Sequence, residues 1–267
     1  MNYMNLFNLT EKVAIITGGH SWLGFDMACA LASAGCHIII ASRNIEKAKA
    51  SCKRIQNIYN VDTLSLSFNQ CDYEQTEQMA KAAYNWKQHI DILINNAGGG
   101  SGSTEGDFFK RPPHLIMNMV VSNLIGPMFV SKAVGKYMVA NKQGKIINLA
   151  SIAALCGRDR RIYYNNKKME QPVDYAAAKA GILGMTKDLA AYMAPYNIQV
   201  NSISPGGFDK KDLPEGFVHD YSEKTIAGRM GMFGGDICGT ALFLSSDASN
   251  YITGQNIVVD GGFSILK

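Results

Sequence analysis

The chain has 267 residues, of which 47% are hydrophobic and 18% charged, and this balance predicts a globular protein long enough for one large α/β domain. Its net charge of +4 is too small and too scattered to argue for a nucleic-acid partner. The six cysteines form no CxxC pair and have no metal-like spacing with histidine, so we expect reduced thiols and no metal site. No signal-peptide pattern is present and no apolar run approaches the roughly 20 residues of a membrane span, so we expect a cytoplasmic protein that is not membrane-bound.

Short apolar runs alternate with amphipathic stretches along the chain. The apolar runs that predict strands are residues 13–17, 36–42, 63–68, 91–96, 144–151, 198–204 and 256–260. The helical patterns between them include residues 25–35, 44–59, 74–86 and 173–192. Such alternation predicts an α/β fold: a single doubly wound Rossmann domain over residues 1–267, with a central parallel sheet of about seven strands and helices on both faces.

Three polar or glycine-rich stretches interrupt this alternation, and we expect all of them at the carboxyl ends of the predicted strands. They are residues 98–107, 158–172 and 205–216. In open parallel sheets, ligands bind beyond the carboxyl ends of the strands. We therefore expect these stretches to border a ligand pocket, with a polar insert at about 157–172 and a substrate lid at about 207–229.

The segment TGGHSWLG (residues 17–24) joins the first predicted strand to the first helix. A phosphate-binding turn needs tight backbone turning and amides that point at the anion, which Gly18, Gly19 and Gly24 permit. His20 and Ser21 add side-chain donors. The candidate cofactor contacts in this turn are Gly18, His20, Ser21 and Leu23.

The second strand ends in Ser42 and Arg43 and offers no acidic residue there. A carboxylate at this place would bind the ribose of NAD, whereas an arginine accommodates the extra phosphate of NADP. Both residues are candidate cofactor contacts. The sequence therefore favours NADP and leaves NAD open.

Tyr175 and Lys179 are four residues apart in a helical pattern and so share one helix face. An ammonium group beside the phenol favours the phenolate and lowers a pKa that is ordinarily about 10. Ser151, at the end of a strand, can donate a hydrogen bond to the same substrate oxygen. Asn123 can hold a water behind the lysine. We predict these four residues as the catalytic set.

Taken together, the motifs resemble the classical short-chain dehydrogenase/reductases from about Leu9 to Gly262. The motifs that carry the resemblance are TGGHSWLG, Asp72, NNAG (95–98), Asn123, Ser151, YAAAK (175–179), PGG (205–207) and the closing segment 243–262. The resemblance implies that Tyr175 is the general acid/base, Lys179 its pKa modifier and a ligand of the nicotinamide ribose, Ser151 a group that polarises the carbonyl, and Asn123 part of a proton relay.

The same resemblance implies further cofactor contacts. Asp72, with Tyr73 beside it, would contact the adenine. The residues expected to line the cofactor or border its nicotinamide are Asn96, Ala97, Gly98, Pro205 and Gly206. A hydride would then move between the nicotinamide and a carbon that bears a hydroxyl or a ketone.

Three features depart from the family pattern. Trp22 replaces the middle glycine of the turn, and we expect it to have a negative φ, with its ring over part of the cofactor site or on the 98–107 loop. Ser151 and Tyr175 are 24 positions apart, about twice the usual spacing, because of the basic segment 158–172. That segment would attract an anion such as a sugar-acid carboxylate, or it is a solvated loop or an oligomer contact. Phe208 follows the PGG turn where the family often has a threonine nearby.

These features predict an NAD(P)-dependent oxidoreductase that acts on a secondary alcohol or ketone. The C-terminal half resembles gluconate 5-dehydrogenase-type members, which favours a sugar acid or a polyol. A 3-oxoacyl-thioester reductase is the alternative enzyme, and a non-catalytic dinucleotide sensor is the alternative class. The family resemblance also implies a homo-tetramer or a dimer.

Overall fold

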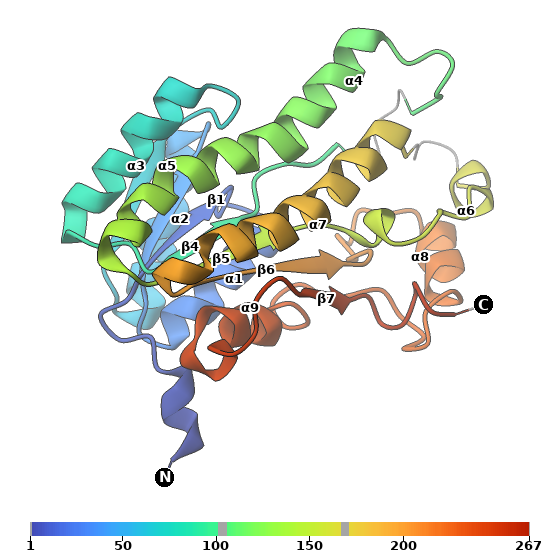
Figure 1. The fold of residues 1–267 in the computed structure, drawn as a ribbon. Helices are drawn as coiled ribbons and strands as arrows, with labels where there is room; N and C mark the ends of the chain where they lie inside the picture. Colours follow the sequence, from blue (N-terminus) through green and yellow to red (C-terminus); the bar gives the residue numbers. More distant parts are fainter. Residues whose placement is uncertain (1, 101–105, 167–170, 267) are drawn as a thin grey trace.

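The apolar runs of the sequence form the seven strands of one parallel sheet in the computed structural model, which describes residues 2–100, 106–166 and 171–266 (Figure 1). The strands are β1 (Val13–Thr17), β2 (His37–Ser42), β3 (Thr63–Ser67), β4 (Ile92–Asn95), β5 (Gly144–Leu149), β6 (Ile198–Pro205) and β7 (Asn256–Val259). Their order is β3-β2-β1-β4-β5-β6-β7, and every neighbouring pair is parallel. The predicted Rossmann-like α/β domain is confirmed.

The helices cover both faces of this sheet. They are α1 (Trp22–Ser33), α2 (Ile45–Tyr59), α3 (Tyr73–Lys87), α4 (Pro113–Val120), α5 (Gly126–Asn141), α6 (Arg161–Tyr164), α7 (Val173–Met193), α8 (Glu215–Ser222) and α9 (Cys238–Ser245). Short turns add η1 (Tyr3–Phe7), η2 (Val121–Ile125), η3 (Ile152–Ala154), η4 (Ala194–Tyr196) and η5 (Asp247–Ser249). The helix predicted at 25–35 begins and ends earlier, because the phosphate turn leads into it at Trp22 and the chain turns at Gly35, whose φ is +90°.

Alternation along β1 divides the core into two layers. Val13 and Ile15 pack in a buried cluster to which α3, α5 and α7 contribute. Ala14 and Ile16 point the other way, into a cluster to which α1, α2 and α9 contribute. Both faces of the strand are therefore buried from solvent, and this explains its uninterrupted apolar sequence.

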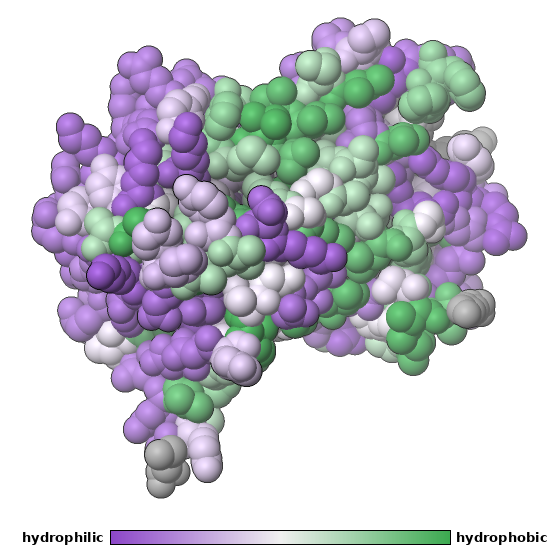
Figure 2. Space-filling model, viewed as in Figure 1, coloured by the Kyte–Doolittle hydropathy of each residue, from purple (hydrophilic) through white to green (hydrophobic). Residues whose placement is uncertain are grey.

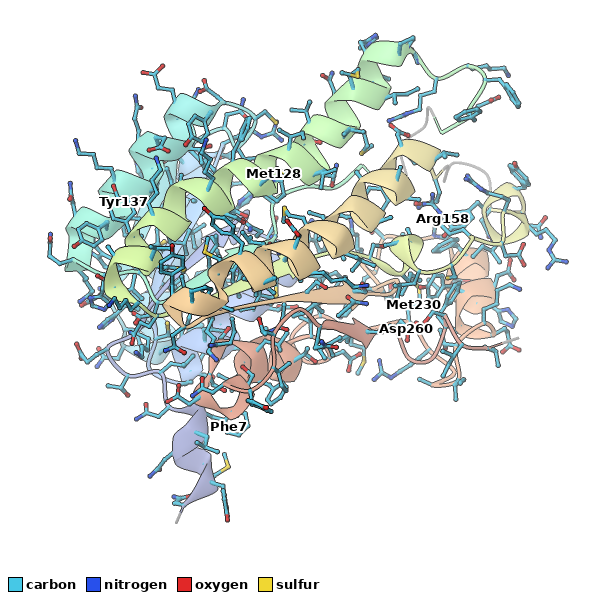
Figure 3. All side chains as sticks on the ribbon, viewed as in Figure 1. Phe7, Met128, Tyr137, Arg158, Met230 and Asp260 are labelled. Carbon is cyan, nitrogen blue, oxygen red and sulfur yellow. The ribbon has the colours of Figure 1, made fainter. Side chains whose placement is uncertain are left out.

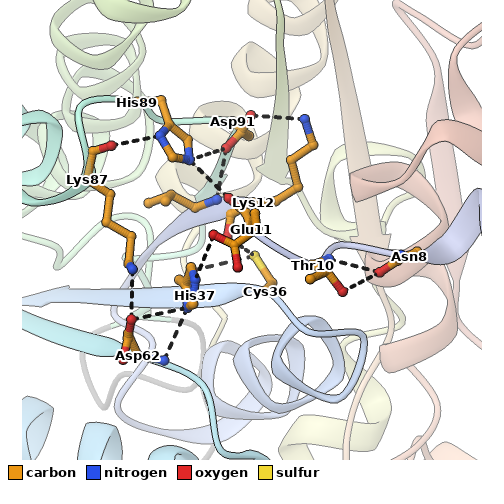
Figure 4. Close-up of polar contacts among 11 residues, drawn as sticks. Asn8, Thr10, Glu11, Lys12, Cys36, His37, Asp62, Lys87, His89 and Asp91 are labelled. Atoms are coloured by element: carbon orange, nitrogen blue, oxygen red, sulfur yellow. Dashed lines mark hydrogen bonds and ion pairs between the residues drawn. The ribbon is translucent and has the colours of Figure 1, made fainter.

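The amino ends of β1, β2 and β4 are held together by a polar network (Figure 4). Asp91 accepts a hydrogen bond from the Val13 N–H at 2.9 Å and forms a 3.2 Å ion pair with Lys12. On the β2 side, Asp62 pairs with Lys87 at 2.7 Å and its N–H donates to His37 Nδ1. These charges lie at the opposite edge of the sheet from the predicted ligand pocket, so we give them a structural role.

One helical stretch, Pro113–Asn141, is long and apolar enough to cross a membrane by length and composition alone. The expectation that no apolar stretch approaches that length is wrong for this segment. Val130, Val134 and Met138 on the stretch are fully buried in the core cluster over the sheet. Packing within the fold thus accounts for this part of its apolar character, and 33% of its apolar window is buried.

The predicted insert and the predicted lid pack on each other beyond the ends of β5 and β6. Ile162 and Tyr163 of α6 form a small buried cluster with Phe217 and Tyr221 of α8. The Tyr163 and Phe217 rings have centroids 5.5 Å apart. The insert is therefore not only a solvated loop: its described part and the segment after β6 form one unit. Residues 167–170 of the insert lie outside the described residues.

Candidate active site

The turn after β1 is held in place by the end of β4. Gly18 has a φ of +65°, which suits glycine. Thr17 Oγ1 accepts hydrogen bonds from the N–H groups of Asn96 (3.0 Å) and Ala97 (2.9 Å), and the Asn96 amide donates to Thr17 O at 2.9 Å. A Cβ on Gly24 would lie 2.5 Å from the Asn96 amide nitrogen. The predicted contacts Gly18, Asn96 and Ala97 therefore lie at one place.

His20, Ser21 and Leu23 continue this turn into α1. The Nδ1 atom of His20 is buried and has no hydrogen-bond partner among the residues that the structure describes. Burial, and secondarily the nearby Lys47, lower the pKa of the His20 imidazole. Ser21 is the N-cap residue of α1 but makes no side-chain capping bond, and Leu23 packs against the core. This geometry supports cofactor contacts from His20 and Ser21, which stay predictions.

Trp22 differs from the sequence-based expectation. Its φ is +51°, in the left-handed region, and not negative. The ring is half-exposed and packs on Phe233, with centroids 5.3 Å apart, while Lys210 Nζ lies 4.8 Å from the ring centroid. The ring therefore contacts the segment after β6. The turn requires a glycine-like backbone at this position, and the contacts with Lys210 and Phe233 offset its strain. Residues 101–105 of the other loop lie outside the described part of the chain.

The end of β2 carries Ser42 and Arg43, as predicted. Ser42 is buried and accepts a hydrogen bond from the Asn44 N–H, and Arg43 is exposed. Asp72 caps α3 by accepting from the Gln75 N–H at 3.1 Å. The Tyr73 phenol donates to Glu77, and its ring packs against α5. Contacts of these residues with a cofactor stay predictions, and for Tyr73 the backbone is the better candidate.

Tyr175, Lys179 and Ser151 come together where β5 ends and α7 begins. Lys179 Nζ lies 5.8 Å from the centroid of the Tyr175 ring and donates to Leu149 O at 2.7 Å. Ser151 follows that carbonyl by two residues, and its Oγ accepts from the Ala153 N–H at 3.2 Å. The three side chains are at most 9% exposed. Burial lowers the pKa of Lys179 to about 8, so its ammonium form still dominates at neutral pH.

Asn123 lies in the middle of η2, a π-helical turn between α4 and α5, and is fully buried. Its Oδ1 accepts from the Gly99 N–H at 2.9 Å, and its Nδ2 donates to Gly99 O at 3.0 Å. A Cβ on Gly98 would lie 2.7 Å from Asn123 Oδ1 and 3.9 Å from Lys179 Nζ. Asn123 therefore holds the glycine-rich segment after β4 directly beside Lys179. The water relay predicted for it stays a prediction.

Pro205 and Gly206 lie at the carboxyl end of β6. The Gly206 N–H donates to Val259 O at 2.9 Å, and a Cβ on Gly206 would lie 2.9 Å from Asp260. The next residue, Gly207, donates its N–H to the phenol oxygen of Tyr221 on α8. Small residues here let the segment after β6 turn closely over the end of the sheet.

Sequence reasoning missed two buried amides that support the site. Gln70 donates to Ala97 O at 3.1 Å and to Ser122 O at 2.7 Å, and so ties the cofactor loop to η2. Asn95 donates to Asn148 Oδ1 at 2.8 Å inside the sheet. For Asn95 the available signal was an amide side chain at the end of a buried apolar strand, where an unpaired polar group is costly. Gln70 follows the partly exposed strand β3 and carries no such signal.

The order of the sheet reverses direction at β1 and β4, so the turn after β1 opens at a topological switch point. A glycine turn there, with a phenol and an amine on one helix face nearby, defines a dinucleotide-dependent oxidoreductase. Among the described residues, no cluster of three or more His, Cys, Asp or Glu side chains could hold a metal ion. All six cysteines are free in the structure.

Comparisons with known proteins agree with this class. A family model described as enoyl-(acyl carrier protein) reductase matches residues 19–264. The chain is 34% identical over 259 residues to the 3-oxoacyl-[acyl-carrier-protein] reductase FabG of Aquifex aeolicus, covering 95% of this chain and 98% of that one. It is 33% identical over 266 residues to the 2-dehydro-3-deoxy-D-gluconate 5-dehydrogenase of Dickeya dadantii, covering 97% and 98%.

Among solved structures, a gluconate 5-dehydrogenase from Burkholderia cenocepacia in complex with NADP and tartrate superposes with a TM-score of 0.87 at 31% identity, covering 98% of this chain and 99% of that one. The chain belongs to the short-chain dehydrogenase/reductase family and is an NAD(P)-dependent enzyme.

The site fits the cofactor that this family uses. The backbone turn at Gly18 opens at the N-terminus of α1, where amide N–H groups attract a phosphate. The unpartnered buried Nδ1 of His20 lies in the same turn. A cofactor laid from this turn toward Gly98 would end beside Lys179, since those two residues are close.

Proposed function

We propose that the enzyme transfers a hydride between NADP or NAD and a secondary alcohol or ketone of a sugar acid or polyol, in the manner of a gluconate 5-dehydrogenase. The convergence of Tyr175, Lys179 and Ser151 beside the cofactor loop carries the catalytic part of this proposal. Relatives that act on gluconate derivatives support the substrate class.

In this proposal the cofactor supplies or accepts the hydride, and the protein manages the proton. Tyr175 gives a proton to the forming alkoxide in reduction and takes it from the alcohol in oxidation. Lys179 keeps a positive charge about one helical turn away, which favours the phenolate. Ser151 donates a hydrogen bond to the reacting oxygen. Asn123 positions the Gly98–Gly99 backbone. It also takes part in the proton relay between Lys179 and solvent.

We favour NADP over NAD as the working cofactor. Arg43 directly follows β2, at the position where an acidic residue would bind the ribose of NAD. Lys47, in the first turn of α2, lies near His20 of the phosphate turn. Titration of tryptophan fluorescence with each cofactor tests this choice. We expect NADPH to bind at least about tenfold more tightly than NADH, and Arg43→Ala to remove most of that difference.

A 3-oxoacyl-thioester reductase remains the second candidate, because FabG proteins match this chain at similar identity. The polar insert beside the catalytic residues argues against it, since an acyl chain would require an apolar wall. A non-catalytic dinucleotide sensor is the third candidate, and the intact Tyr175–Lys179 pair argues against it.

The deciding experiment is nicotinamide absorbance with a panel of aldonates, ketoses, polyols and acetoacetyl thioesters, with identification of the products. We expect turnover of a sugar acid or polyol and a loss of at least about 1000-fold in kcat/KM for Tyr175→Phe, with unchanged cofactor affinity. Preference for the thioester would select the second candidate. Cofactor binding with no turnover of any alcohol or ketone would select the sensor.

We also propose that the enzyme is a cytoplasmic homo-tetramer. Apolar side chains gather over α4, α5 and α7 on the face that Figure 2 shows, and Met117 and Met128 are 64% and 43% exposed. Val258 on the edge strand β7 and Ile265 in the C-terminal segment are exposed as well, and a neighbouring subunit would cover them. Light scattering should give four times 29.1 kDa, and Met117→Glu with Met128→Glu should lower that mass.

A further inference from the structure

Two arginines of the insert meet at one backbone carbonyl. Arg158 Nη2 lies 3.4 Å from Gln171 O, and Arg160 Nη1 donates to the same oxygen. Arg158 also donates to the Gln171 side-chain oxygen and, at 2.9 Å, to Pro172 O. All of these acceptors are uncharged, so none of them compensates the positive charge of either guanidinium group.

Two acidic groups among the described residues of this region are engaged elsewhere. Asp159 pairs with Arg161 at 2.7 Å and with Lys224 at 2.8 Å, on the outer side of the insert. Asp260 accepts hydrogen bonds from the N–H groups of Gly262 and Ser264. Among the described residues, no carboxylate forms a salt bridge with Arg158 or Arg160 within the 4.0 Å limit that defines one. Two like charges at one carbonyl repel each other, and a bound anion would relieve that repulsion.

The pair lies close to Tyr175, whose charge interacts with that of Arg158. Pro172 directly precedes α7, and Tyr175 is three residues further on, about 4.5 Å along the helix axis. Burial lowers the pKa of Arg158. The charge of Arg160 lowers this pKa further, whereas Tyr163 and Tyr175 raise it. Figure 3 shows Arg158, Met230 and Asp260 on the same side of the molecule, beyond the ends of β6 and β7.

We propose that Arg158 and Arg160 bind the carboxylate of the substrate, which makes hydroxy acids and keto acids the preferred substrates over neutral polyols. The guanidinium fork matches a carboxylate with two parallel hydrogen bonds. Gln171 is a positioning residue that holds Arg158 in place through its side-chain oxygen. This inference rests on the proposed hydride transfer and adds the group that selects the substrate.

The test compares two six-carbon substrates, D-gluconate and D-glucitol, which differ in one carboxylate, with NADP as the oxidant. Arg158→Gln should lower kcat/KM for D-gluconate by about 20-fold or more and for D-glucitol by less than about threefold. Arg158→Lys should fall between wild type and Arg158→Gln. The matched control is Arg161→Gln in the same insert, exposed and paired outward with Asp159, which should change neither value more than about twofold.

Thermal unfolding of each variant separates substrate recognition from loss of structure. A similar loss on both substrates, or no loss on D-gluconate, would overturn the inference. Wild-type turnover of D-glucitol with no turnover of D-gluconate would overturn it too, while leaving hydride transfer intact. If neither is turned over, the proposed substrate class fails, and calorimetry with D-gluconate and NADP decides the inference. Binding that weakens about tenfold or more in Arg158→Gln supports it, and an absence of binding sinks it.

Discussion

Trp22 holds a left-handed backbone conformation, with φ of +51°, at a position that suits glycine. A residue with a Cβ loses about 1–2 kcal/mol in this conformation. Trp22→Gly and Trp22→Ala both remove the ring and its contacts with Lys210 and Phe233, but only alanine keeps the strain. We expect the free energy of unfolding of Trp22→Gly to exceed that of Trp22→Ala by about 1 kcal/mol. Urea unfolding followed by circular dichroism measures this, and equal stability would mean that the turn does not require positive φ here.

Asn123 satisfies both backbone groups of Gly99. Asn123→Ala removes both hydrogen bonds to the partly buried Gly99 backbone, so we expect a loss of about 1 kcal/mol in the free energy of unfolding. Because the same bonds hold the cofactor loop, cofactor affinity should fall as well. Thermal unfolding with and without NADPH tests both effects. Asn118→Ala, at an exposed position of α4, is the control and should change neither quantity.

Residue pairs within one helix could be predicted from the sequence, whereas contacts distant in sequence could not. The spacing of Tyr175 and Lys179 places them on one face of α7, and in the structure Lys179 lies beside the Tyr175 ring and donates to Leu149 O, two residues before Ser151. The ring of Trp22 packs on Lys210 and Phe233, nearly 200 residues away. No local pattern specifies such a contact, because it depends on how the segment after β6 folds back over the sheet.

At the scale of elements, a buried ion pair joins the segment before α4 to the start of α7. Arg111 Nε and Asp174 Oδ2 are 2.9 Å apart, and both side chains are at most 5% exposed. Removing one partner leaves a buried charge, so we expect Arg111→Met to lower the free energy of unfolding by about 3 kcal/mol. Adding Asp174→Leu should restore most of that loss, since two apolar groups replace the pair. A denaturation cycle over the four proteins tests this.

A double variant no more stable than Arg111→Met would contradict that expectation. In that case Asp174 would contribute through contacts other than the pair with Arg111. Activity of the double variant adds a second readout, because Asp174 directly precedes Tyr175 in α7. We expect its kcat/KM to fall if the pair also fixes the first turn of α7.

The strands were predictable because buried parallel strands are continuously apolar, and the helix ends were predictable where a capping residue is present, as with Asn44 and Asp72. The start of α1 was not, because a left-handed tryptophan begins it. The packing of α6 on α8 was also unforeseen. Each segment alone is polar enough to suggest a solvated loop, and only their shared cluster of aromatic side chains reveals the contact.

For the whole molecule, strand alternation was sufficient to predict the sheet and the edge at which ligands bind. Strand alternation could not indicate that the amino ends of the strands are held by the network around Asp91 and Asp62. That network joins charges far apart in sequence. Strand alternation also gave no reason to expect an apolar helix as long as Pro113–Asn141. Glycine, asparagine and serine interrupt the apolar run, and only the continuation of α4 through η2 into α5 makes it one long helical stretch.

Two buried lysines at opposite ends of β5 make the stability of the fold depend on pH. Burial lowers the pKa of Lys179 and of Lys145 from 10.5 to about 8. Below about pH 8 both the folded and the unfolded chain hold these protons, and the folded state carries the cost of the buried charge. Between about pH 8 and 10.5 the unfolded chain holds more protons, so stability due to these lysines rises with pH.

Lys179→Met isolates this effect, since other titrating groups are shared by the variant and the wild type. We expect the free energy of unfolding of the wild type, relative to Lys179→Met, to rise by about 2 kcal/mol between about pH 7.5 and about pH 9.5. Lys145→Met should show a change in the same direction. The lost hydrogen bond to Leu149 O shifts the difference by a constant and leaves its slope unchanged. Urea unfolding at the two pH values measures the slope, and a flat difference would mean that Lys179 is solvated in the folded protein.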